Sequence, residues 1–116
     1  KISGGKYKKQ RKRRIRDLQG QRRLVKLGKV KRKVKRTSGG NKKVVLFSID
    51  EINVKTNSGK IQKTKIKNVI ETPSNKFLAR QNIITKGTIL ETELGKVRVS
   101  SRPSQSGILN GILINN

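Results

Sequence analysis

The chain has 116 residues, of which 31 are Lys or Arg and 6 are Asp or Glu, so its formal net charge is +25. A surface of one charge sign repels itself unless a polyanion neutralises it, and nucleic acid is the most common such partner. The chain contains no Cys and no His, which excludes disulfides, thiolate zinc sites and the usual general base of an enzyme.

An anionic membrane surface is the alternative partner for so basic a chain. Membrane-active basic segments need an apolar face that carries Trp, Phe or Leu, and this sequence has no Trp, two Phe and one Tyr. The sequence also lacks an apolar run long enough to cross a membrane and a hydrophobic signal peptide. We therefore expect a cytoplasmic protein with no membrane partner, no small-molecule substrate and no cofactor.

Charge and apolar content divide the chain into two parts. Residues 1–43 hold 20 Lys or Arg and one acid, for a charge of +19, whereas residues 44–116 hold 11 basic and 5 acidic residues, for +6. Apolar residues account for 9 of the first 43 positions and for 26 of the remaining 73. We therefore predict a basic, nucleic-acid-binding extension without a core of its own at residues 1–43 and one folded domain at residues 44–116.

Within the extension, residues 8–16 show neither the helical nor the strand spacing that would bury a face. Leu27, Val30 and Val34 do recur at three- and four-residue intervals, which is compatible with a short helix. The composition is typical of a tail that is disordered in solution and becomes ordered on nucleic acid. The candidate phosphate-binding cations of this stretch are Lys6, Lys8, Lys9, Arg11, Lys12, Arg13, Arg14, Arg16, Arg22, Arg23, Lys31, Arg32, Lys33, Lys35 and Arg36.

Two glycine pairs, at residues 4–5 and 39–40, are followed by Lys, the second after Asn41, but neither has the spacing of a nucleotide-binding loop. One interpretation is a flexible turn. The other is close passage of backbone N–H groups past phosphates, with a positive φ at one glycine. The second pair is the better candidate because we expect the extension to meet the domain there. The candidate residues of this junction are Gly39, Gly40, Asn41, Lys42 and Lys43.

From residue 44 onward the pattern is that of short strands, because 17 of the 26 apolar residues are Val or Ile and turn residues recur about every ten positions. In residues 44–56 the alternation shifts phase at Asp50 and Glu51, which predicts a bulge or bend. Residues 57–59 predict a hairpin turn. The return strand at 60–71 is followed by a helical turn at 76–81, capped by Ser74 or Asn75.

The last third of the chain predicts three more strands. Residues 83–90 read as a strand broken at Gly87, residues 88–93 and 96–101 form a hairpin with its tip at Leu94 and Gly95, and residues 108–114 form the closing strand. Five to six strands in about 70 residues predict an all-β fold, a small closed or partly open barrel that hides its edges. Its weaker candidate nucleic-acid contacts are Lys63, Lys65, Arg80, Lys86 and Arg102.

The sequence does not support catalysis. Glu91 and Glu93 could share one face of a strand, but without a His or a third acid beside them a solvated outer face is the expected arrangement. We predict neither an enzyme nor a metal site. The only aromatic residues are Tyr7, Phe47 and Phe77, so the base-stacking platforms of single-strand readers are missing, and recognition should rest on charge and shape.

Several motifs together resemble one known family, small-subunit ribosomal protein eight of the archaeal and eukaryotic type. Two of them lie in the basic part, at residues 1–6 (KISGGK) and residues 38–44 (SGGNKKV). Three more lie in the β part, at residues 70–80 (IETPSNKFLAR), 83–87 (IITKG) and 100–103 (SSRP) with Gly107. Residues 16–20 depart from the family pattern, because many members have a Tyr-Glu-apolar-Gly stretch and prolines after the basic run.

The resemblance implies a small β-barrel whose N-terminal extension penetrates small-subunit ribosomal RNA, with neighbouring ribosomal proteins as further partners. The long extra segments of eukaryotic members are missing, which implies an archaeal type. The main hypothesis from the sequence is therefore a structural ribosomal protein. Its rivals are a chromatin-type protein that coats DNA through the same charge and the precursor of a membrane-active basic peptide.

Overall fold

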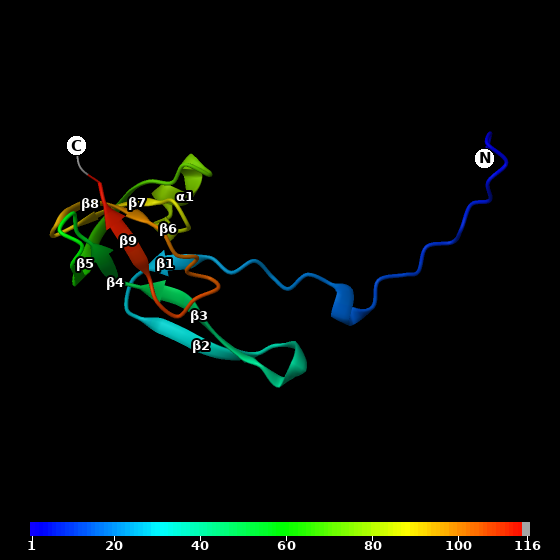
Figure 1. Ribbon diagram of the computed structural model, residues 1–116, viewed down its shortest axis with the longest axis horizontal. Helices are drawn as coiled ribbons and strands as arrows, with labels where there is room; N and C mark the ends of the chain where they lie inside the picture. Colours follow the sequence, from blue (N-terminus) through cyan, green and yellow to red (C-terminus); the bar gives the residue numbers. More distant parts are fainter. Residues whose placement is uncertain (115–116) are drawn as a thin grey trace.

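A closed five-stranded barrel is the central feature of the computed structural model, which describes residues 1–114 (Figure 1). The strands pair antiparallel in the order β4, β5, β7, β8 and β9, and parallel pairing of β9 with β4 closes the barrel. Closure leaves these strands without a free edge, and it confirms the predicted all-β barrel. The barrel strands are β4 (Glu51–Lys55), β5 (Ile61–Glu71), β7 (Ile89–Thr92), β8 (Gly95–Val99) and β9 (Asn110–Leu113).

The connections of the barrel follow the predicted turns. Gly59 in the β4–β5 turn has a φ of +81° and Gly95, the first residue of β8 after the β7–β8 turn, has a φ of +122°, both in the region that favours glycine. The short helix α1 (Lys76–Arg80) begins after Asn75, whose side-chain oxygen accepts a hydrogen bond from Phe77 N at 2.9 Å. Asn75, and not Ser74, is therefore the N-cap.

The phase shift at Asp50 is a bend that carries the chain from one sheet into another. β3 (Lys42–Ile49) ends just before it and β4 begins just after it. Ile49 is buried at the end of β3, and Ile52 and Val54 are buried in β4, so the bend restores the inward face as expected. Ile66 N donates a hydrogen bond to Asp50 O at 2.8 Å and holds the bend against β5.

A second sheet of four strands lies beside the barrel, in the order β2, β3, β1 and β6. β1 pairs parallel with β3 and antiparallel with β6, while β2 pairs antiparallel with β3. The short helix considered for residues 27–34 is therefore wrong, because both edges of β1 and one edge of β2 have strand partners. The bounds are β1 (Val25–Leu27), β2 (Lys31–Arg36) and β6 (Ile83–Ile84).

The hydrophobic core extends from the barrel into this second sheet. Val25 is 1% exposed and belongs to the same buried cluster as Leu46, Ile52 and Leu90. The part of the chain without packing partners therefore ends at Leu24. The boundary that the sequence predicted between residues 43 and 44 falls inside β3. The strands within residues 25–36 both pair with β3, and this pairing could not be predicted from the composition of residues 25–36 alone.

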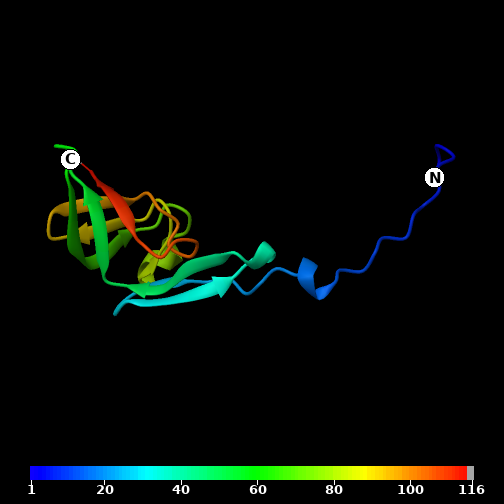
Figure 2. The same ribbon diagram turned by 60° about the horizontal axis from the view of Figure 1, so that its bottom comes forward.

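The molecule is far more extended than a folded chain of its length. Its radius of gyration is 19.5 Å, compared with about 13 Å expected for a compact domain of this size. Residues 1–24 and the β2–β3 hairpin leave the barrel toward the same side in both views (Figures 1 and 2). Within residues 1–114, the structure contains no helix long and apolar enough to span a membrane.

Candidate nucleic-acid interface

The extension, residues 1–24, presents its charge without a fold to shield it. It holds 11 Lys or Arg and one acid, Asp17, and all of its residues are exposed except Arg23, which is half-buried. Asp17 pairs with Arg11 at 2.8 Å and accepts a hydrogen bond from Arg14 N at 3.2 Å, closing the single turn η1 (Ile15–Asp17). The predicted phosphate contacts on this exposed stretch are Lys6, Lys8, Lys9, Arg11, Lys12, Arg13, Arg14, Arg16 and Arg22.

The basic hairpin, which we define as residues 31–43, is the second concentration of charge. Two cross-strand pairs on it join like charges, because Lys35 lies opposite Lys43 and Arg36 lies opposite Lys42. Like charges directly opposite each other destabilise a ladder, so an anion bound between them would relieve a repulsion that the free protein contains. The seven cations of the hairpin, all among the predicted contacts, are Lys31, Arg32, Lys33, Lys35, Arg36, Lys42 and Lys43.

Replacement of Lys35 by Gln is expected to stabilise the free protein while weakening its binding to nucleic acid. The substitution removes the repulsion with Lys43, which is worth roughly 0.2 to 1 kcal/mol at low salt and less as salt screens it. Thermal unfolding at low and high salt measures the effect. Lys33→Gln is the matched control because Lys33 lies opposite Val45; equal stabilisation by both variants would contradict the cross-strand explanation.

The glycine pair of the hairpin is its tip and not the junction of the extension with the domain. Gly39 and Gly40, in the turn η2 (Ser38–Gly40), have φ of +76° and +77°, so the expected positive φ occurs at both. Thr37 N donates to Asn41 O at 2.7 Å and Asn41 Nδ2 donates to Ser38 O at 3.4 Å, which closes the turn. The expected junction at Gly39, Gly40 and Asn41 is wrong, because the extension joins the fold at β1.

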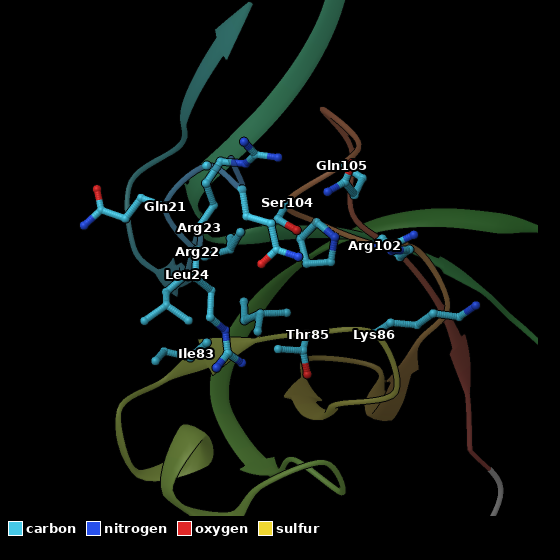
Figure 3. Close-up of a pocket in the computed structure, with 15 residues that line it drawn as sticks. Gln21, Arg22, Arg23, Leu24, Ile83, Thr85, Lys86, Arg102, Ser104 and Gln105 are labelled. Atoms are coloured by element: carbon cyan, nitrogen blue, oxygen red, sulfur yellow. The ribbon is translucent and has the colours of Figure 1, made fainter. Parts of the chain in front are cut away.

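A groove lies where the extension meets the folded part, and we call it the root groove (Figure 3). Its volume is about 600 Å³, and residues 19–25, 83–86 and 102–105 line it. Lys86 and Arg102 lie on the side opposite Gln21 and Leu24 (Figure 3). Four cations that the sequence predicted separately line this groove, namely Arg22, Arg23, Lys86 and Arg102.

The remaining predicted barrel contacts do not line the root groove. Lys63 forms an ion pair with Glu51, and Lys65 lies opposite the same acid in the β4–β5 register. The guanidinium carbon of Arg80 lies 5.7 Å from the centre of the Phe77 ring. The charge of Lys63 is therefore partly matched by an acid of the barrel, and the Arg80 guanidinium contacts an aromatic ring of α1.

The acids of the barrel form no candidate catalytic or metal site. Glu91 and Glu93 are both exposed, which confirms the solvated outer face expected for them. Among residues 1–114, no group of three His, Cys, Asp or Glu side chains is placed to hold a metal ion.

Comparison with known proteins decides the family. The family model described as ribosomal protein S8e matches residues 1–114. The chain belongs to the ribosomal protein S8e family. This confirms the resemblance stated from the motifs, and the family is one of structural ribosomal components, which confirms that the chain is not an enzyme.

Three archaeal relatives of this S8e chain are each named small ribosomal subunit protein eS8. The protein of Staphylothermus marinus is 47% identical over 116 residues, covering 98% of this chain and 91% of the relative. That of Methanococcus aeolicus is 55% identical over 86 residues, covering 72% and 66%. That of Nanoarchaeum equitans is 43% identical over 114 residues, covering 97% and 90%.

Sequence reasoning missed the polar residues that complete the root groove of this S8e protein. Gln21, Ser104 and Gln105 line it beside the four cations, and Gln105 accepts a hydrogen bond from Lys43 of the basic hairpin. No local pattern marks these residues, because the groove forms only when three distant segments meet.

Proposed function

We propose that the chain binds small-subunit ribosomal RNA through the extension and the basic hairpin, as a structural protein that supports assembly of the small subunit. The observation that carries the proposal is the arrangement of charge. Residues 1–43 hold 20 of the 31 cations and one acid, and the two basic segments leave the barrel toward the same side (Figures 1 and 2). The family and the names of the archaeal relatives favour ribosomal RNA over other polyanions.

The two basic segments suit folded RNA because they contact phosphates without needing exposed bases. Strongly charged narrow arms can follow the phosphate backbone between helices, and their side chains carry no sequence code. If roughly ten phosphates are neutralised, the logarithmic slope of affinity against salt would be on the order of −7 to −9. The extension and the basic hairpin thus act as the RNA-binding part, while the barrel anchors them beside neighbouring ribosomal proteins in the cytoplasmic ribosome.

Competition between small-subunit ribosomal RNA and duplex DNA at equal phosphate concentration tests the proposal. We expect the RNA to displace the DNA, because folded RNA offers grooves and crossings that a uniform duplex lacks. Sedimentation of the chain with small subunits in a cell extract at physiological salt is the companion measurement. Preference for DNA, or sedimentation away from the small subunit, would support the chromatin-type alternative instead.

A further inference from the structure

The root groove concentrates positive charge without any compensating acid. Arg22, Arg23, Lys86 and Arg102 line it together, and no Asp or Glu is among its lining residues. Neither of the two ion pairs found within residues 1–114 involves any of the four. Like charges gathered in one concavity raise its local potential and attract an anion strongly. We therefore expect an anion to bind more strongly in the groove than at any single exposed cation of the extension.

The same groove holds an unsatisfied donor. The Arg23 side-chain Nε is buried, yet no acceptor within the described part of the chain lies in hydrogen-bond reach. A buried donor without a partner is destabilising, and native structures nearly always satisfy such groups. An anionic oxygen bound in the groove would accept this hydrogen bond once the Arg23 side chain turns to expose its Nε, so the unpartnered donor and the charge point to the same kind of occupant.

Hydrogen bonds fix the walls of the groove in advance. The 102–105 loop is held on β3 because Leu46 N donates to Pro103 O at 3.3 Å, and it is folded as a turn because Gln105 N donates to Arg102 O at 3.0 Å. On the facing side, Ile83 and Ile84 are fully buried in β6. A site whose walls are already in place loses less entropy on binding than a mobile tail does.

We propose that the root groove is a discrete site for one nucleotide unit of RNA, held by its phosphate between the extension and the 102–105 loop. This deepens the proposed function and rests on it. The volume of about 600 Å³ lies within the range of about 300 to 1,000 Å³ typical of small-ligand sites, so the groove admits the sugar beside the phosphate. Gln105 also lines the groove, and its side-chain amide can donate to ribose or base oxygens without selecting one base.

Such a site also explains why the extension leaves the domain where it does. Arg22 and Arg23 belong to the extension, whereas Lys86 and Arg102 belong to loops of the folded part. A phosphate contacted from both sides would tie the C-terminal end of the extension to the folded part. RNA bound at this point would therefore set the direction in which residues 1–21 continue.

Binding of the full chain to a small-subunit ribosomal RNA fragment at about 0.15 M salt tests the site. The groove variant carries both Lys86→Gln and Arg102→Gln. Its matched control carries both Lys96→Gln and Arg98→Gln on β8, which removes one Lys and one Arg from exposed positions outside the groove. We expect the groove variant to lose at least about 30-fold in affinity and the control less than about threefold, because charge-assisted hydrogen bonds in a preformed site are much stronger than exposed charge contacts. Arg102→Lys, which keeps the charge but loses the planar fork, should fall between them.

Equal losses in the groove variant and the control would overturn the site while leaving RNA binding by the extension intact. Failure of the wild-type chain to prefer ribosomal RNA would instead overturn the proposed function, so the two failures are distinguishable. Titration of the full chain with inorganic phosphate, followed by the NMR shifts of the backbone amides of Arg102, Ser104 and Gln105, gives a second readout. We expect saturable shifts in the wild type that the groove variant lacks; unsaturated shifts of equal size in both would reject a discrete site.

Discussion

Removal of residues 1–24 is expected to cut the salt slope of RNA binding by about half and the affinity at about 0.15 M salt by on the order of a thousandfold. The deletion takes away 11 of the 31 cations together with one acid. If these cations neutralise about five phosphates, the slope falls by about 4, and a slope of 4 acting between about 0.15 M and 1 M salt corresponds to roughly three powers of ten. The folded part should survive, because Val25 is the first residue of the core.

Two measurements separate the loss of charge from damage to the fold. Filter binding of a small-subunit ribosomal RNA fragment across a salt series gives the slope, and thermal unfolding of the same protein gives its stability. A full-length chain with every Lys and Arg of residues 1–24 replaced by Gln is the matched control, and it should reproduce the deletion. An unchanged slope in both variants would refute the role that we propose for the extension.

The substitution Gly111→Ala is expected to destabilise the barrel by about 1 to 3 kcal/mol, the usual cost of overpacking a core. Gly111 lies in β9, where the barrel closes against β4, and it is buried. A Cβ at this position would lie 2.5 Å from Val97 Cγ1, 2.8 Å from Ile52 Cδ1 and 3.1 Å from the backbone oxygen of Arg98. The neighbours on both adjacent strands would have to shift, and backbone cannot shift cheaply.

Chemical denaturation of the Gly111→Ala protein measures this cost. Gly20→Ala is the matched control, because a Cβ at Gly20 would meet nothing within 4 Å; it should change stability by less than about 0.5 kcal/mol. Adding Val97→Ala to Gly111→Ala should recover part of the loss by removing the closest contact. A Gly111→Ala protein as stable as the control would show that the barrel relaxes around the added methyl group.

The free protein contains groups of like charges whose mutual repulsion its own residues do not neutralise. Lys35 opposes Lys43, Arg36 opposes Lys42, and four cations share the root groove. Such an arrangement is costly for an isolated domain, and it becomes favourable when a polyanion supplies the missing charge. The arrangement of charge in the basic part is therefore the one expected of a protein that functions in complex with a polyanion.

The sequence alone was sufficient to predict the features that depend on local chemistry. The charge of residues 1–43 follows from counting side chains, and the bend at Asp50 follows from a change of phase in an alternating pattern. The turns at Gly59 and Gly95 follow from the backbone freedom of glycine. The barrel could be expected from short Val- and Ile-rich strands separated by turns, because closing a small sheet is the simplest way to hide its edges.

Only the tertiary structure decided where the extension ends and which cations meet. β1 has three residues, too few for any periodicity, and its state depends on hydrogen bonds to β3 and β6, which lie far away in the sequence. The root groove likewise draws Arg23, Lys86 and Arg102 from three separate segments. Charge is a property of each residue and can be read from the sequence, whereas the convergence of charges is a property of long-range pairing, which no local pattern encodes.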